Sequence, residues 1–302
     1  MRRGESNLKI HFIGIGGEGM CGVAQLALAQ GHQITGSEIA AKRNLEELKS
    51  SKITIFKSHS PDNIKQVRLV VRSSGILMNH VEVISAQQKG ITILKRSECL
   101  GMLLKDSGKY IISVAGSHGK STTTTMLGRI LEEAELDPTV IVGAEAPCFN
   151  GHVRIGKGKF IVVEACEFDR SFLDIGGNSA IITSIEEDHL DYYQGGLSEI
   201  INTFSIFSEL ITDNIILCAD NFAMLLSDRY KRKYTTYGLK GGFWRAEFSN
   251  SSENGRYSFN VFQGCHFFGT FTIPIAGLHI IQNALGAIVM SVSSTPFFRH
   301  FV

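Results

Sequence analysis

A cluster of glycine, lysine and hydroxyl residues, GSHGKSTTTT at residues 116–125, has the clearest chemistry in this sequence. Such a loop exposes backbone N–H groups, carries a lysine charge and leads into a helix whose first turn is electropositive. Gly119 would let the main chain approach oxygen atoms, Lys120 would offset β/γ-phosphate charge, and Ser121 would ligate Mg²⁺. The longer form of the motif has a glycine where Val114 stands, so the sequence predicts a shortened phosphate loop. The alternative is a hydroxyl-rich helix start without a ligand.

Acidic residues follow two further apolar runs. One group is Glu164, Glu167 and Asp169; the other is Glu186, Glu187, Asp188 and Asp191, with His189 among them. Because strand ends beside a phosphate loop supply the remaining ligands of a bound metal, these residues predict a cation site. Spacing alone leaves open that Asp169 and Asp188 are solvated or cap helices.

A second glycine pattern, GxGxxG, spans Gly14 to Gly19, and Glu38 follows about 20 residues further on. On physical grounds the pattern fits a dinucleotide fingerprint, with pyrophosphate at a helix N-terminus and an acid on the ribose hydroxyls. NAD and a UDP-sugar share the diphosphate-ribose unit, so the loop by itself leaves both open.

The elements that must position these residues follow from the pattern along the chain. Short apolar runs alternate with helical patterns through the first hundred residues, which is typical of βαβ units and a parallel sheet. A helix is expected at residues 42–51. Apolar runs at 110–115, 160–165, 179–184 and 214–219, with helices after Ser121 and at 197–210, predict a second α/β domain.

The pattern changes at residues 241–275 to aromatic-rich alternation broken by Ser, Asn and Gly, which predicts an antiparallel β meander. A helix is expected at 278–292, and no element after it. The predicted fold class is therefore α/β, with two domains. A Rossmann-like domain occupies residues 1–105, and a P-loop-type α/β domain carrying the meander occupies residues 106–302.

Composition narrows the functional classes. The 302 residues are 43% apolar and carry a net charge of +1, so no polybasic surface points to nucleic acid or to an anionic membrane. The six cysteines form no CxxC pair, which argues against zinc or redox motifs of that kind. The N-terminal segment resembles neither a secretory signal nor a membrane span, so the predicted location is cytoplasmic.

Taken together, the motifs resemble those of the bacterial Mur ligases. HFIGIGGEGMCGVA is similar to the family's opening HFxGIGGxGMxGxA, GSHGKSTTTTML to GTHGKTTTT, VVEACEFDRSFL to xxEADExDxSFL, and TSIEEDHLDYY to TNIxxDHLDxY. Shorter matches occur in the family's order at residues 73–76, 150–160 and 277–288. The resemblance runs from about residue 8 to residue 290, and it is strongest to the branch that joins L-alanine to UDP-N-acetylmuramate.

The resemblance implies an ATP-dependent acid–amino-acid ligase of peptidoglycan biosynthesis, and it replaces NAD by a UDP-sugar in the first domain. The implied catalytic residues are Lys120, Glu164 and His189, and the implied Mg²⁺ ligands are Ser121, Glu164 and His189. The implied ATP site comprises Gly116, Ser117, His118, Gly119, Lys120, Ser121, Thr122 and Asn283, with Asn283 on the adenine side. The implied UDP-sugar site comprises Gly16, Gly17, Glu38, His59 and Ser74.

The chain also departs from the family. Members carry a third, C-terminal domain that closes over ATP and supplies the amino-acid site, and no such domain is expected within these 302 residues. Cys166 stands where the family has Asp, Ile280 where it has Asn, and Ser58 where it has Gly. The sequence therefore leaves open a catalytically silent UDP-sugar/ATP-binding module or a truncated remnant. A separate polypeptide could supply the third domain.

Overall fold

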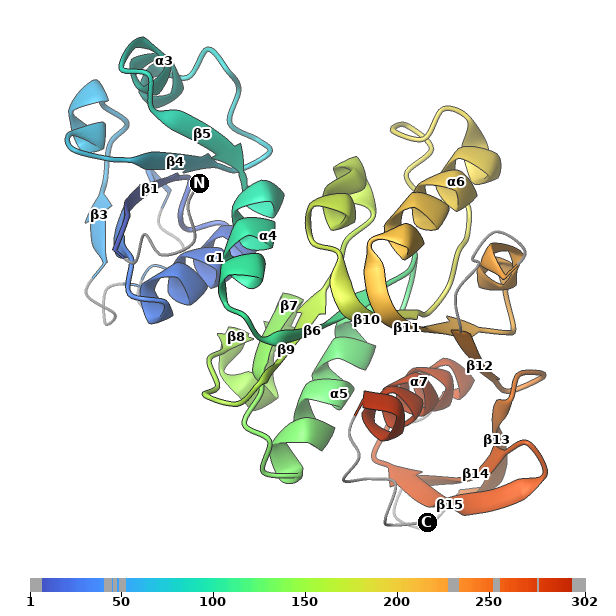
Figure 1. Ribbon diagram of the computed structural model, residues 1–302. Helices are drawn as coiled ribbons and strands as arrows, with labels where there is room; N and C mark the ends of the chain where they lie inside the picture. Colours follow the sequence, from blue (N-terminus) through green and yellow to red (C-terminus); the bar gives the residue numbers. More distant parts are fainter. Residues whose placement is uncertain are drawn as a thin grey trace. The chain divides into compact units, whose positions relative to one another are not determined.

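The computed structural model describes residues 7–40, 45, 48, 53–227, 234–251, 256–275 and 277–294. The helix expected at 42–51 lies outside the described residues except for Leu45 and Leu48, which are helical. The final segment, 295–302, for which no element is expected, also lies outside them. The chain forms two compact units: residues 1–109 with 141–155, and residues 110–140 with 156–302 (Figure 1).

The first unit is built on a five-stranded sheet with the order β3-β2-β1-β4-β5, in which every neighbouring pair is parallel. Its strands are β1 (Lys9–Ile13), β2 (Gln33–Ser37), β3 (Thr54–Phe56), β4 (Leu69–Arg72) and β5 (Thr92–Lys95). Its helices are α1 (Glu18–Ala29), the 3₁₀ helix η1 (Pro61–Ile64), α3 (Val81–Gln88) and α4 (Arg96–Asp106). Crossovers between parallel strands require such intervening helices.

Two features of the first unit position its loops. Gly14 follows β1 in a left-handed conformation with φ 76°, which starts the turn into α1. His80 caps α3, because its Nδ1 accepts a hydrogen bond from the Glu82 N–H at 3.3 Å. Buried apolar side chains hold α3 and η1 against the sheet, among them Ile13, Val70 and Val83.

A ten-stranded mixed sheet with the order β15-β14-β13-β12-β11-β10-β6-β9-β7-β8 forms the core of the second unit, and its residues 141–155, in β7 and β8, are the segment grouped with the first unit. The strands are β6 (Tyr110–Ala115), β7 (Thr139–Ala146), β8 (Gly151–Arg154), β9 (Phe160–Glu164), β10 (Gly177–Ile182), β11 (Ile211–Cys218), β12 (Tyr234–Gly238), β13 (Trp244–Ser251), β14 (Tyr257–Gln263) and β15 (His266–Ile273). The helices are α5 (Lys120–Glu133), α6 (Gly196–Glu209), α7 (Leu278–Ser294) and the 3₁₀ helices η2 (Pro147–Phe149), η3 (Phe168–Asp174) and η4 (Phe222–Leu226).

Helices cover both faces of the central strands. Helices α5 and α7 pack against one another on one face, and α6 lies on the other (Figure 1). On the α6 face, Phe204 and Phe207 pack against alternate residues of β10 and β11, such as Ile182 and Leu217. Strands buried on both faces are expected to carry apolar runs, as the buried residues 180–182 of β10 and 215–218 of β11 do.

The predicted fold class is confirmed: an α/β chain with a parallel N-terminal sheet and a central sheet that ends in antiparallel strands. The meander is part of the central sheet, because β13 pairs in parallel with β12, which pairs in parallel with β11. The strands β7, β8 and β12 were not expected. Strands β8 and β12 are only four and five residues long and lack an apolar run.

No helix in the part of the chain that the structure describes has the length and apolar character needed to cross a membrane.

Candidate nucleotide and metal-binding site

The loop between β6 and α5 has a backbone that two glycines make possible. Gly116 has φ 140°, and a Cβ there would lie 2.1 Å from Thr183 Oγ1. Gly119 has φ 82°, and a Cβ there would lie 2.4 Å from Asn283 Oδ1. Both positions therefore require glycine for conformation and for space. Asn283 on α7 thus lies directly against the loop.

Side chains at the end of β10 hold the loop in place. The Ser117 N–H donates to the Ser184 carbonyl at 2.9 Å, and the His118 N–H donates to Ser184 Oγ at 2.9 Å. The Thr183 hydroxyl donates to the His118 carbonyl at 2.5 Å. These bonds occupy the amides of Ser117 and His118. The first-turn amides of α5, which have no intrahelical acceptor, are therefore the ones oriented for an anion.

The Lys120 ammonium is held over the loop by three acceptors. Its Nζ donates to the carbonyls of Gly116 at 2.6 Å and Ser117 at 3.0 Å, and to Glu167 Oε1 at 3.1 Å. Glu167 Oε2 lies 2.9 Å from the same nitrogen, and the side chains of Lys120 and Glu167 are 13% and 3% exposed. This ion pair fixes the lysine beside the α5 N-terminus, where a phosphate group would bind.

A metal-ligating group lies beside this lysine. Glu167, Asp188 and His189 each offer one ligand atom, and these atoms lie within 4.8 Å of one another. His189 Nε2 is 3.7 Å from Glu167 Oε1 and 3.7 Å from Asp188 Oδ2. Two carboxylates and an imidazole form a donor set that suits a divalent cation, so the side chains present fit the expected metal.

The backbone around this group is unusual. His189 has φ 53°, a left-handed conformation that is uncommon for a residue other than glycine, and its N–H donates to Asp188 Oδ1 at 2.7 Å.

Aromatic side chains pack around the ligand group. The hydroxyl of Tyr193, a residue that is 1% exposed, donates to the Glu167 carbonyl at 2.6 Å. Burial, reinforced by Glu167, raises the pKa of Tyr193, so it stays a neutral donor. The His189 ring also meets Phe168 edge-on at 5.2 Å.

The remaining predicted metal ligands lie nearby on the same framework. Ser121 stands in the first turn of α5, and Glu164 ends β9, where it pairs with Val114 of β6 just before the loop. Among the described residues, the mutually close ligand group contains Glu167 and not Glu164. The structure thus brings Lys120 and His189 together through Glu167.

Sequence reasoning placed Glu167 among the acids of a cation site but assigned it no role. The motif contains both Glu164 and Glu167, and spacing does not show which of them reaches the lysine. The fold decides this: Glu167 is the N-cap of η3, where its carboxylate meets Lys120, and Asp169 and Arg170 inside η3 are left-handed, with φ 54° and 53°. Cys166 lies half-buried beside it, and burial together with Glu167 raises the pKa of its thiol.

The predicted UDP-sugar residues of the first unit follow the carboxyl ends of its parallel strands. Gly16 and Gly17 follow β1, Glu38 follows β2, His59 follows β3, and Ser74 lies exposed in the turn after β4. Parallel strands present these ends at one edge of the sheet, which is where α/β folds bind ligands. A Cβ at Gly16 would lie 3.1 Å from Glu38 Oε2, so the glycine loop contacts the acid.

The fold and the loop together define a P-loop-type α/β protein with a separate Rossmann-like unit. Residues 9–107 match the model of the Mur ligase family, catalytic domain, and residues 114–291 match the Mur ligase middle domain. The chain therefore belongs to the Mur ligase family.

Curated relatives and solved structures agree with this assignment. The chain is 37% identical over 287 residues to the UDP-N-acetylmuramate–L-alanine ligase of Caldanaerobacter subterraneus, covering 94% of this chain and 62% of that protein. It is also 37% identical over 287 residues to the enzyme of the same name from Acetivibrio thermocellus, covering 92% and 60%. The chain thus spans about 60% of the length of these relatives.

Among solved structures, the UDP-N-acetylmuramate–alanine ligase of Thermotoga maritima is 28% identical with a TM-score of 0.84, covering 95% of this chain and 65% of that one. A UDP-N-acetylmuramate:L-alanyl-γ-D-glutamyl-meso-diaminopimelate ligase from Neisseria meningitides shares the fold with a TM-score of 0.83 at 22% identity. There the match covers 94% of this chain and 93% of that one.

Proposed function

We propose that this chain is an ATP-dependent ligase of peptidoglycan precursor synthesis that joins L-alanine to UDP-N-acetylmuramate. The observation that carries the proposal is the buried Lys120 ammonium beside the α5 N-terminus, next to the ligand group of Glu167, Asp188 and His189. Family membership and the activity named for the relatives support the choice of substrates. The proposed substrates are water-soluble compounds, in keeping with the predicted cytoplasmic location.

In this proposal the unit built on the ten-stranded sheet binds ATP and the unit built on the five-stranded sheet binds the UDP-sugar, with a boundary between residues 105 and 106. The ATP phosphates contact Gly116, Ser117, His118, Gly119, Lys120, Ser121 and Thr122. Asn283, which the structure places against Gly119, completes the ATP site. The UDP-sugar contacts Gly16, Gly17, Glu38, His59 and Ser74.

Ser121, Glu164 and His189 are the proposed Mg²⁺ ligands, and Glu167 and Asp188 join them because their ligand atoms lie beside His189. When bound, Mg²⁺ would neutralise phosphate charge during transfer. The chain's own residues do the rest. Lys120 faces the negative charge on the transferred phosphoryl group, and the first-turn amides of α5 hold the phosphate oxygens.

The proposed chemistry has two steps. A carboxylate oxygen of the muramyl group attacks the γ-phosphorus of ATP, and the bond from that phosphorus to the oxygen of the β-phosphate breaks. ADP departs, and the muramyl group is now an acyl phosphate. The amine nitrogen of L-alanine then attacks the acyl carbon. The tetrahedral intermediate expels inorganic phosphate, and the amine proton passes to solvent. A fixed lysine suits both steps, because each builds negative charge on phosphoryl or carbonyl oxygens.

The test is ADP release by the purified chain with ATP, Mg²⁺, UDP-N-acetylmuramate and L-alanine, omitting each component in turn. We expect release that requires all four and that is lost in Lys120→Ala. Replacing L-alanine by glycine or L-serine tests the choice of amino acid. Absence of ADP above background would reject the activity.

A second candidate is a UDP-sugar/ATP-binding module without catalysis, since the chain spans only about 60% of the length of the relatives that are named as ligases. Calorimetric titration separates the two candidates. Binding of both nucleotides without turnover would support the module, and turnover would support the ligase. If neither nucleotide bound, both candidates would fail.

A further inference from the structure

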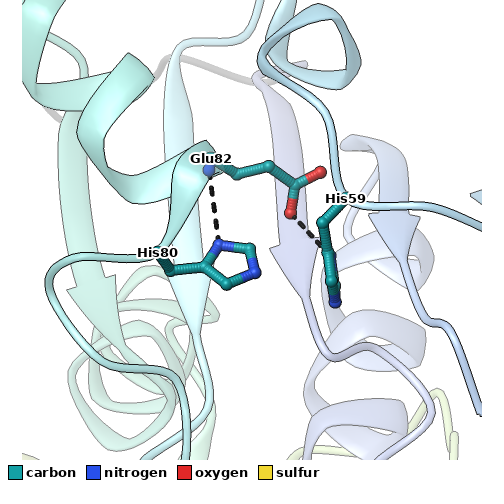
Figure 2. A group of neighbouring side chains, drawn as sticks. All are labelled: His59, His80 and Glu82. Atoms are coloured by element: carbon teal, nitrogen blue, oxygen red, sulfur yellow. Dashed lines mark hydrogen bonds and ion pairs between the residues drawn. The ribbon is translucent and has the colours of Figure 1, made fainter.

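Two imidazoles and a carboxylate converge at the sheet edge of the first unit. They are distant from the phosphate loop in sequence, and that loop belongs to the second unit. His59, His80 and Glu82 each offer one ligand atom, and these atoms lie within 4.8 Å of one another. His59 follows β3, His80 caps α3, and Glu82 lies in the first turn of that helix. The three side chains point toward a common space (Figure 2).

The geometry within this group is close to that of a metal site. Glu82 Oε2 is 3.0 Å from His59 Nδ1, and the two imidazole rings meet edge-on, with centroids 4.4 Å apart. Figure 2 shows the Nε2 side of the His80 ring turned toward the space between the Glu82 carboxylate and His59. A tetrahedral ion with bonds of about 2.0–2.1 Å separates its ligand atoms by about 3.4 Å. The carboxylate and His59 need to move apart by only a few tenths of an ångström.

A second layer of residues fixes the carboxylate. Ser37 Oγ donates to Glu82 Oε2 at 2.7 Å, and Asn63 Nδ2 donates to Glu82 Oε1 at 2.7 Å. The Glu82 side chain is 0% exposed and that of His59 is 17% exposed. Outer partners of this kind orient the ligands of known metal sites and contribute strongly to affinity.

We propose that His59, His80 and Glu82 form a binding site for one divalent transition-metal ion of the Zn²⁺ type. Two imidazoles with one carboxylate are a set that Zn²⁺, Co²⁺ and Cu²⁺ prefer, whereas Mg²⁺ favours oxygen ligands. The ion takes the place of the proton between His59 Nδ1 and Glu82, and that proton passes to solvent. Binding through His80 Nε2 moves the ring proton to Nδ1, which gives up the cap on the Glu82 N–H.

Zinc is the probe, and diffraction locates it. Crystals of the full chain, treated with chelator and soaked in Zn²⁺ without nucleotide, are measured at the zinc absorption edge. We expect an anomalous peak about 2.0–2.2 Å from ligand atoms of all three residues. An empty position there under saturating Zn²⁺ would overturn the proposal. Because no ATP or UDP-sugar is present, this outcome is independent of the proposed ligase activity.

A matched variant tests the same point in solution. Asparagine is a strong helix N-cap, so His80→Asn removes an imidazole ligand and keeps the cap of α3. We expect calorimetry to show Zn²⁺ affinity at this site reduced about 10- to 100-fold or more. His59→Gln provides a second ligand variant, and thermal unfolding verifies that each is folded. Unchanged zinc affinity in both folded variants would contradict the proposal.

Two controls separate this site from other zinc ligands. His189→Ala disrupts the ligand group beside Lys120, and His266→Ala removes an exposed imidazole on β15. Both variants should keep the anomalous peak at His59. Mg²⁺ at millimolar concentration should not displace Zn²⁺ from it. Loss of the peak in His189→Ala, or its displacement by Mg²⁺, would also contradict the assignment.

Discussion

Lys120 Nζ lies 2.9 Å from Glu167 Oε2, and the two side chains are almost completely buried. Removing one partner of such a pair leaves an uncompensated charge in the interior, which costs more than the pair itself contributes. The pair therefore has two separable consequences, one for stability and one for nucleotide binding.

Lys120→Met should lower the free energy of unfolding by about 3–5 kcal/mol, because Glu167 loses its counter-ion. The double variant Lys120→Met/Glu167→Gln should recover much of this loss, since no charge remains unpaired. Neither variant should bind ATP at the affinity of the unchanged chain. Denaturant unfolding and calorimetric ATP titration measure the two effects. Normal ATP affinity in either variant would show that Lys120 does not contact the phosphates.

Gly119→Ala should abolish nucleotide binding. A Cβ there would lie 2.4 Å from Asn283 Oδ1, so the loop must move. The left-handed φ of this position also strains an alanine backbone. Gly90→Ala is the matched control, because Gly90 is also left-handed, with φ 65°, and has open space around its Cβ position. The control should cost about 1–2 kcal/mol of stability and leave ATP binding unchanged. Equal ATP affinity for the two variants would argue against the steric explanation.

Asp220→Ala should destabilise the second unit by about 2–4 kcal/mol. The Asp220 carboxylate accepts the Leu239 and Lys240 N–H groups at 2.6 and 3.0 Å, and the Gln282 amide at 2.7 Å. Because Gln282 precedes Asn283 on α7, the variant should also raise the Kd for ATP several-fold. Asp62→Ala, which breaks an exposed ion pair, should change stability by less than about 1 kcal/mol. If the two variants were equally stable, Asp220 would not be a structural anchor.

Buried and exposed cysteines should react with iodoacetamide at different rates. Burial raises the pKa of the Cys99 thiol to about 12 and that of Cys218 to about 11. At pH 8 the thiolate fraction of these two buried thiols is therefore far smaller than that of an exposed thiol, and the reactive form grows only as pH rises toward these values. The exposed Cys148 and Cys265 should label first. Mass spectrometry of timed digests measures the order, and labelling of Cys99 at the rate of Cys148 in folded protein would contradict it.

The alternation of apolar runs and helical patterns predicted all five strands of the first sheet and most strands of the second, because the buried parts of parallel strands are short apolar runs. It did not predict β12, whose sequence YTTYG carries no such run. This strand forms because β11 and β13 offer hydrogen-bonding edges on either side of it. Its existence therefore depends on pairing with the strands beside it and not on a local apolar pattern.

The sequence by itself determined the strand-loop-helix setting of GSHGKSTTTT and the acidic residues that accompany it, because glycine, lysine and hydroxyl spacing is a local property of the chain. Tertiary structure decided that Glu167 pairs with Lys120, that Asn283 abuts Gly119, and that His59 and His80 meet at Glu82. These pairings join residues on different strands and helices. Their geometry is set by sheet order and by left-handed turns at residues such as His189, which no spacing rule specifies.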